Sequence, residues 1–127
     1  MATIDITEAT FDETITENEI VFVDFWADWC GPCRQFAPVY SATSEKHPDV
    51  VFAKVDTDAN QGLAAAANIT SIPTLMAFRD KVLVFSQPGA LPAAAFAELV
   101  DAVKAIDMKA VHAEIAAQDA AETAPSA

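Results

Sequence analysis

The chain of 127 residues is poor in basic side chains: seven lysines and arginines stand against 19 aspartates and glutamates, which leaves a net charge of −12. A surface of this sign repels the phosphates of nucleic acids and the anionic headgroups of lipids. We therefore expect neither a nucleic acid nor a membrane as a partner. We interpret the acidic excess itself as a solubility feature.

The sequence also lacks any run of about 18 apolar residues, so it predicts no membrane-spanning helix. Its first eight residues (MATIDITE) contain neither a basic stretch nor an apolar core. Because a secretory signal peptide needs both, we expect none, and we expect a cytoplasmic location.

Cysteine and histidine are scarce as well. The only cysteines, Cys30 and Cys33, form a Cys-Gly-Pro-Cys motif, and the only histidines, His47 and His112, lie far apart. In a reducing compartment a lone close cysteine pair is catalytic or metal-binding rather than structural. Structural zinc needs four ligands, which this chain does not offer in the usual spacing. We therefore expect no metal site and no cofactor beyond a redox-active Cys30–Cys33 disulfide.

The spacing of apolar residues predicts five strands and four helices in the order βαβαβαββα. We expect the strands at residues 3–6, 20–26, 50–55, 74–78 and 82–86. We expect the helices after an N-cap at Thr7, at residues 31–46 and 61–67, and from Pro92 onward. Because residues 20–26 are apolar on both faces except for Asp24, they are typical of a central strand. The fold class is therefore α/β, with one mixed sheet flanked by helices.

These elements fill one domain, residues 1–107. The remaining residues, 108–127, keep a short helical pattern of apolar residues and then become acidic and alanine-rich. We expect a helical extension that frays from Ala116 and ends in a disordered tail.

The cysteine motif begins where the central strand passes into a helix. The free N–H groups and the dipole of a helix N-terminus stabilise an anion, so the thiolate of Cys30 is favoured there, and Arg34 adds a positive charge. Side chains three residues apart on a helix have Cβ atoms about 5–6 Å apart, and a disulfide needs about 3.8 Å. A bond to Cys33 can therefore form with slight adjustment. Because it closes almost no loop, it adds little stability, and we interpret it as an exchange centre.

Residues 26–34 (WADWCGPCR) resemble the active-site stretch of the thioredoxin family. The resemblance continues at Pro38 and at residues 23–25, 54–56 (KVD), 71–74 (SIPT) and 88–90 (PGA), and it covers about residues 3–106. It implies a thioredoxin fold and a monomeric thiol–disulfide oxidoreductase that reduces protein disulfides. In this scheme Cys30 attacks a target disulfide, and Cys33 resolves the mixed disulfide. The implied partners are disulfide-containing target proteins and an NADPH-dependent thioredoxin reductase.

A catalytic role for Asp24 is indicated by its position as well as by the resemblance. Burial in the central strand raises the pKa of a carboxylate, which can then accept the proton of Cys33 during resolution. The alternative is an aspartate that faces solvent at a strand bend. The pairing of Lys54 with Asp24 is implied by the resemblance only.

The resemblance also implies supporting residues and a docking surface. Gly31 and Pro32 separate the cysteines, and Pro73 matches the family's cis-proline, whose loop faces the two sulfurs. The implied docking rim for substrate consists of Trp29, Ile72 and Gly89. For Trp29 the alternative is ordinary core packing.

Two features depart from the family pattern. Lys81 stands where a turn usually ends in glycine, so we expect it to adopt a positive φ. The segment after Asp107 has no counterpart in the family pattern, and we assign it no function.

Two other functions remain open. One is an oxidant or isomerase of secreted proteins, although such proteins usually carry histidine between the cysteines and require export. The other is a docking subunit that uses the same surface without redox chemistry.

Overall fold

The structure is a computed structural model, and it describes residues 2–123. Five strands form one mixed sheet in the order β1-β3-β2-β4-β5. β1 (Thr3–Asp5), β3 (Val51–Asp56) and β2 (Ile20–Trp26) run parallel to one another. β4 (Thr74–Arg79) is antiparallel to β2, and β5 (Val82–Pro88) is antiparallel to β4. The predicted α/β class with one mixed sheet is confirmed, and β2 is its central strand.

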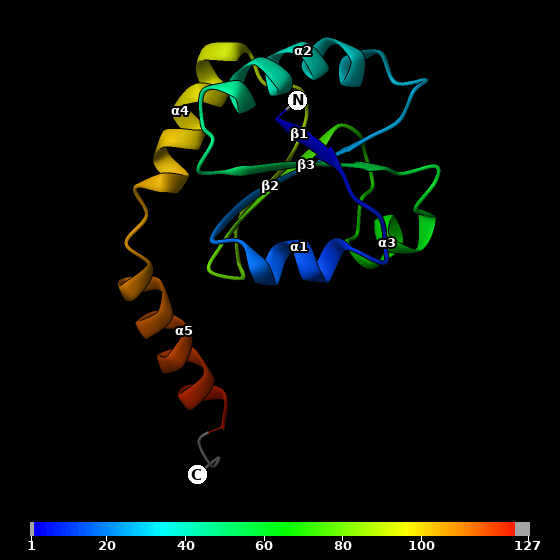
Figure 1. Ribbon diagram of the computed structural model, residues 1–127. Helices are drawn as coiled ribbons and strands as arrows, with labels where there is room; N and C mark the ends of the chain where they lie inside the picture. Colours follow the sequence, from blue (N-terminus) through cyan, green and yellow to red (C-terminus); the bar gives the residue numbers. More distant parts are fainter. Residues whose placement is uncertain (1, 124–127) are drawn as a thin grey trace.

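Helices cover both faces of this sheet (Figure 1). α2 (Gly31–Glu45) and α4 (Ala93–Lys104) lie on one face, and α1 (Phe11–Glu17) and α3 (Gln61–Ala66) lie on the other. A fifth helix, α5 (Met108–Thr123), follows α4 at the edge of the molecule. No helix among residues 2–123 is long and apolar enough to cross a membrane.

Two cores, one on each face, hold the helices to the sheet. On the α2/α4 face, aromatic rings from the strands and from both helices pack together: Phe22, Phe36, Tyr40, Phe52 and Phe96. On the α1/α3 face, alternate residues of β2 pack against Ile15 of α1. Because side chains alternate along a strand, β2 needs apolar residues at both odd and even positions, which explains its nearly unbroken apolar sequence.

The structure corrects several predicted helix ends. α1 begins at Phe11 after Thr10, so Thr7 is not its N-cap; the N–H of Thr7 instead donates to Thr10 Oγ1. Pro92 is the residue before α4 rather than the first residue of the helix. Short polar residues in the loop before α1 offer several equivalent caps, so the sequence alone could not choose among them.

α5 is the last helix of the chain that the structure describes. The helix continues past Ala116 to Thr123, and its fraying from Ala116 stays a prediction. The predicted disorder of residues 124–127 falls outside the described part of the chain. Met108 is buried, and Val111 and Ile115 are half-buried, so the predicted apolar positions are the ones through which α5 packs.

Arg79 joins the end of β4 to the end of α4, a contact that the sequence did not reveal. Its guanidinium is buried, and Nη1 donates to the carbonyl oxygens of Val103 and Lys104 at 2.7 and 3.0 Å. The last carbonyls of a helix have no partner within the helix and carry partial negative charge. The arginine therefore both satisfies and neutralises the C-terminus of α4.

The turn between β4 and β5 contains two non-glycine residues in the left-handed region, Asp80 with a φ of 49° and Lys81 with a φ of 70°. The positive φ expected at Lys81 is confirmed. A left-handed conformation costs an L-residue about 1–2 kcal/mol, and glycine avoids this at an entropic cost of about 0.5–1 kcal/mol.

Lys81→Gly is therefore expected to stabilise the protein by about 0.5 kcal/mol, measured as a higher melting temperature by calorimetry. The matched control is Lys81→Ala, which removes the same charge and keeps the strained backbone. If the alanine variant gains as much as the glycine variant, charge removal and not backbone strain is the cause.

Candidate active site

The two cysteines lie at the junction of β2 and α2. β2 ends at Trp26, three residues form a short loop, and Cys30 is the N-cap of α2 with extended backbone angles. Cys33 follows in the first turn of the helix, and the two residues form a disulfide with Cα atoms 5.2 Å apart. This separation lies within the usual range of about 4.4–6.8 Å for disulfides, so the helix accommodates the bond without leaving its regular path.

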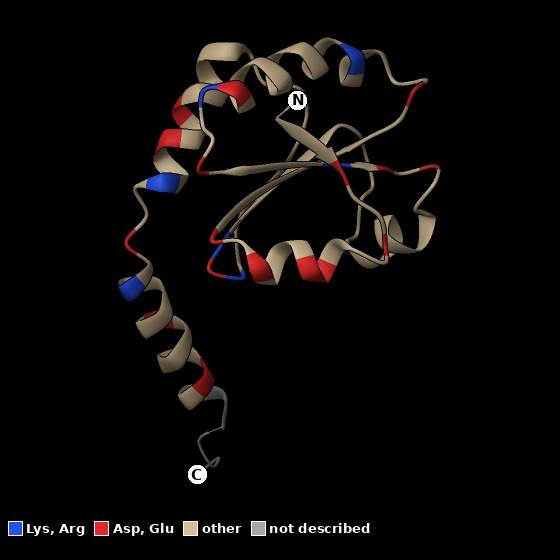
Figure 2. Ribbon diagram, in the orientation of Figure 1, with Lys and Arg blue, Asp and Glu red and all other residues tan. Residues whose placement is uncertain are grey.

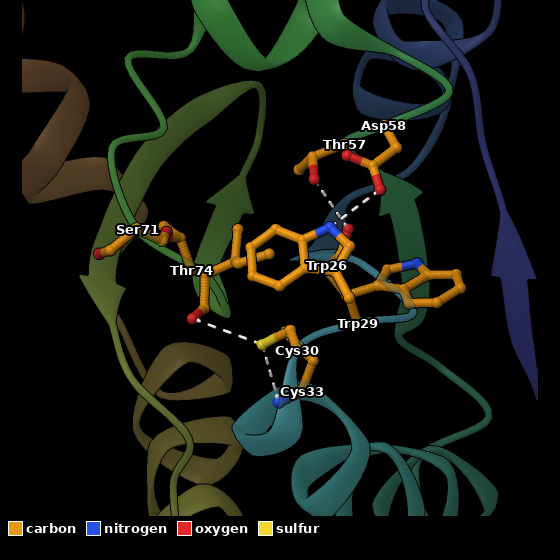
Figure 3. Close-up of a disulfide and its surroundings, with 9 residues drawn as sticks. Trp26, Trp29, Cys30, Cys33, Thr57, Asp58, Ser71 and Thr74 are labelled. Carbon is orange, nitrogen blue, oxygen red and sulfur yellow. Dashed lines mark hydrogen bonds between the residues drawn. A yellow bond between two sulfur atoms is a disulfide. The ribbon is translucent and has the colours of Figure 1, made fainter.

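The N-terminus of α2 points a hydrogen-bond donor at the sulfur of Cys30. The backbone N–H of Cys33 donates to Cys30 Sγ over 3.2 Å (Figure 3). The same donor and the helix dipole would favour a thiolate over a thiol at this sulfur once the disulfide is reduced. The exposed Arg34 lies in the same first turn and adds a cation to this end of the helix.

Both sulfur-bearing residues are largely covered. Cys30 is 4% exposed and Cys33 is 2% exposed, so Cys30 is the more accessible of the two by a small margin. Its location beside an open rim distinguishes it further, because the preceding residue, Trp29, is 71% exposed. The alternative that Trp29 is an ordinary core residue is therefore wrong.

A second segment, residues 71–74, lies opposite the disulfide. Cys30 Sγ is 3.6 Å from the carbonyl oxygen of Ile72, and the Ile72–Pro73 peptide bond is cis. Gly89, with a φ of 106°, donates its N–H to Pro73 O at 2.7 Å and so lies beside this segment. The N–H of Ile72 donates to no residue in the described chain, which leaves it available to an extended peptide.

Trp29 is held in place by a residue that the sequence analysis missed. Its indole Nε1 donates to Asp58 Oδ2 at 3.0 Å (Figure 3). Asp58 follows β3 and is 29 residues away in sequence, and no local pattern predicts such a contact. A groove begins at this indole and is lined by Trp29, Thr57, Ala64, Ile69, Thr70, Ser71 and Ile72. The predicted rim residues Trp29 and Ile72 are thus neighbours across this groove.

Asp24 is buried, with 1% of its surface exposed, so the alternative of a solvent-facing aspartate is wrong. Neither carboxylate oxygen has a hydrogen-bond partner in the part of the chain that the structure describes. Burial raises the pKa of Asp24 to about 7, and the charge of Lys54 opposes this increase.

Strand alternation places Asp24 on the sheet face that α2 covers. Its neighbour on that face of β2 is Phe22, and its register partner on β4 is Leu75; both belong to the core beneath α2 and α4. Cys33 is buried in the first turn of α2. Asp24 and Cys33 therefore share one side of the sheet, as a proton acceptor for Cys33 requires.

Lys54 is the register partner of Asp24 on β3, as the resemblance implied. Its Nζ lies 4.7 Å from the centroid of the Trp26 ring, which is a cation–π contact. Among the described residues the two charged groups form no ion pair, so Lys54 acts on Asp24 through space rather than by direct contact.

Two further findings concern residues near the cysteines. Tyr40 of α2, which the sequence analysis did not single out, is fully buried and donates its hydroxyl to Ala53 O at 2.7 Å. Burial raises the pKa of Tyr40, and the charge of Asp24 raises it further. A Cβ at Gly31 would meet nothing within 4 Å. Gly31 therefore leaves open space beside the disulfide rather than relieving a close contact.

Within residues 2–123, no group of three or more histidine, cysteine, aspartate or glutamate side chains is arranged to hold a metal ion.

The comparisons with known proteins agree with this geometry. Residues 2–102 match the sequence model of the family described as Thioredoxin. The chain is 51% identical over 119 residues to a Streptomyces coelicolor protein named putative thioredoxin 2. This match covers 94% of this chain and 89% of the Streptomyces protein. It is 45% identical to thioredoxin 1 of Synechococcus elongatus, over 76% of this chain and 92% of that one.

Solved structures show the same fold. The solution structure of oxidised thioredoxin from Plasmodium falciparum matches with a TM-score of 0.72 and 36% identity, and it covers 81% of this chain and 98% of that one. A mutant thioredoxin from Halobacterium salinarum matches with a TM-score of 0.71 and 33% identity, over 80% and 94% of the two chains. The predicted fold family is confirmed.

The family model ends at residue 102, so the segment after Asp107 lies outside the family pattern, as expected. One relative nevertheless shares part of this segment. A match over 119 residues of a 127-residue chain must extend at least to residue 119. Most of α5 therefore has a counterpart in the Streptomyces protein.

Proposed function

This chain belongs to the thioredoxin family and is a thiol–disulfide oxidoreductase, and we propose that Cys30 is the nucleophile with which it reduces disulfides in target proteins. The observation that carries this role is the hydrogen bond from the N–H of Cys33 to Cys30 Sγ at the N-terminus of α2. Because this donor interacts more strongly with an anionic sulfur than with a neutral one, it lowers the free energy of the reactive form.

The proposed reaction takes two exchange steps. The Cys30 thiolate attacks one sulfur of the target disulfide, a new S–S bond forms, and the other target sulfur leaves as a thiolate. Cys33 then loses its proton and attacks Cys30 Sγ, which releases the second target sulfur. The target gains two electrons and two protons, and the protein is left with the Cys30–Cys33 disulfide that the structure contains.

Asp24 is the proposed acceptor of the Cys33 proton, directly or through a water molecule. A carboxyl group with a pKa of about 7 exchanges protons readily near neutral pH. Its burial on the α2 face supports this role, as does the absence of any other hydrogen-bond partner for its oxygens among the described residues. Lys54 limits the increase in the pKa of Asp24 and so keeps it within the useful range.

The proposed docking surface consists of Trp29, Ile72 and Gly89, with Pro73 between the last two. An extended target segment can pair with the free N–H of Ile72, as strands pair at the edge of a sheet. Gly31 leaves the space between the cysteines open, since a Cβ there would meet nothing within 4 Å, and Pro32 follows it in the first turn of α2.

The proposed source of electrons is an NADPH-dependent thioredoxin reductase acting on a monomer in the cytoplasm. With such a reductase, NADPH and a disulfide-containing protein, we expect steady oxidation of NADPH, followed at 340 nm, only when this protein is present. A variant with Cys30→Ser and Cys33→Ser should give no rate above background.

Two results would contradict this proposal. If the doubly substituted variant supported the same rate, the cysteines would not be the redox centre, as a docking role requires. If equilibration with glutathione buffers left the protein largely in the dithiol form, and if its Cys30–Cys33 disulfide oxidised dithiol substrates and was itself reduced in the exchange, it would act as an oxidant.

A further inference from the structure

The acidic residues around the disulfide gather on one side of it. The loop before α2 contains the exposed Asp28, β3 ends at Asp56, and the loop after β3 contains the exposed Asp58. Residues 55–78, which form the other wall of the groove beside Trp29, include no lysine and no arginine. Figure 2 shows both loops with acidic positions and α3 without charge, whereas the basic position of α2, Arg34, follows the disulfide on the helix.

The carboxylate of Asp58 is fixed at the rim of the groove. Its Oδ2 accepts the hydrogen bond from Trp29, which itself lines the groove together with Thr57. The loop is held in turn by Asp56, whose Oδ1 accepts from the N–H of Asp58. Asp28 directly precedes Trp29 in the chain. The carboxylate of Asp58 thus lies beside the indole in a position that its hydrogen bonds determine, and the exposed Asp28 adds a second negative charge in the loop that carries Trp29.

The groove also suits an extended peptide. Its lining combines apolar side chains, Trp29, Ile69 and Ile72, with the small polar residues Thr57, Thr70 and Ser71. Its lining includes Ile72, whose carbonyl oxygen is 3.6 Å from Cys30 Sγ and whose N–H is unpaired among the described residues. A target cysteine bound to Cys30 would therefore have its neighbouring residues in the groove, close to Asp28 and Asp58.

We propose that this protein preferentially reduces disulfides whose cysteine is flanked by lysine or arginine in the segment that occupies the Trp29 groove. This inference rests on the proposed function and adds the substrate class to it. An opposite charge at the rim attracts the target during encounter, while an acidic flank is repelled by both carboxylates. The apolar lining holds the neighbouring side chains, and the two aspartates select their charge.

The test uses three synthetic peptides, each with one disulfide, that differ only in having Lys, Gln or Glu beside one cysteine. kcat/KM for their reduction is measured at about 0.01 M and about 1 M ionic strength, where charges are screened beyond about 30 Å and about 3 Å. At low ionic strength we expect kcat/KM for the Lys peptide to be about 3- to 10-fold higher than for the Gln peptide, as two exposed charge interactions would give. The Glu peptide should fall below the Gln peptide, and the differences should shrink at high ionic strength.

The matched variants separate local charge from net charge. Asp28→Asn with Asp58→Asn removes two charges at the groove and keeps an amide oxygen for Trp29, and the Lys-to-Gln ratio should fall close to one. Glu13→Gln with Glu17→Gln removes two charges from α1, none of whose residues lines the groove, and the ratio should stay as in the unmodified protein.

Three outcomes would overturn the inference. A Lys-to-Gln ratio near one in the unmodified protein means that the rim does not select charge. An equal loss of preference in both double variants means that only net charge matters. If none of the three peptides is reduced, the proposed function fails and the inference fails with it, whereas the first two outcomes leave the proposed function intact.

Discussion

A Cys33→Ser variant is expected to stop after one exchange step, with its target bound to Cys30 through a stable disulfide. Resolution depends on a thiol held next to the mixed disulfide, and intramolecular groups in good geometry act with effective concentrations of about 10⁵ M or more. No free thiol in an assay approaches this value, so turnover should fall by more than about 1,000-fold. The measurement is the mass of the intact adduct, together with the rate of multiple-turnover reduction.

The matched control is Cys30→Ser, which keeps the buried thiol of Cys33 and removes the one at the helix N-cap. This variant should form no adduct, because Cys33 lacks the backbone donor that activates its neighbour and is slightly less exposed. If Cys30→Ser trapped targets as well as Cys33→Ser did, the assignment of nucleophile and resolving thiol would be reversed. Mass spectrometry of the adducts would also identify the target proteins.

Asp24→Asn is expected to make the protein more stable at pH 8 and slower at resolving mixed disulfides. In the folded protein the pKa of Asp24 is about 7, against an ordinary value of 3.8. Between these two values the folded state holds a proton that the unfolded state has released. The free energy of unfolding therefore decreases as pH rises through this window, by about 1.4 kcal/mol per pH unit, and does not change further above the folded pKa.

The free energy of unfolding decreases by about 4 kcal/mol in total over this window. Asparagine does not ionise, so the Asp24→Asn variant should avoid most of this decrease. Denaturant unfolding from pH 4 to pH 9 measures this directly. We expect the two proteins to differ little near pH 4 and the variant to be more stable by about 2–4 kcal/mol at pH 8, since a buried amide without partners offsets part of the gain. The control is Asp101→Asn, an exposed change on α4. A profile for Asp24→Asn as steep as that of the unmodified protein would show that another group titrates.

The same variant tests the proposed proton transfer. The rate at which Cys33 releases a bound target should fall by about 10- to 1,000-fold, because general bases typically contribute about 10²–10⁴-fold and solvent replaces part of that effect. Formation of the mixed disulfide by Cys30 should change little. If both steps slow equally, Asp24 affects the site as a whole rather than the proton of Cys33.

Much of the fold follows from local patterns. The alternation and length of the apolar segments were enough to predict the five strands, the four helices of the domain and the central place of β2. The positive φ at Lys81 was predicted from the family resemblance, because the family usually has a glycine at the end of this turn. Helix ends were predicted less well, at Thr7 and Pro92 for example, because capping depends on small free energies that neighbouring segments can reverse.

The sequence by itself determined where the redox pair lies and why the first sulfur is activated. Cys30 and Cys33 are three residues apart at a strand–helix boundary, and both their proximity and the donor from α2 arise within one turn of chain. The environment of that pair was decided only by the tertiary structure. Contacts such as Trp29 with Asp58, or Cys30 with Ile72, join residues 29 and 42 positions apart. The increase in the pKa of Asp24 likewise depends on how completely α2 and the neighbouring strands exclude water, a property of the packed molecule that no local spacing records.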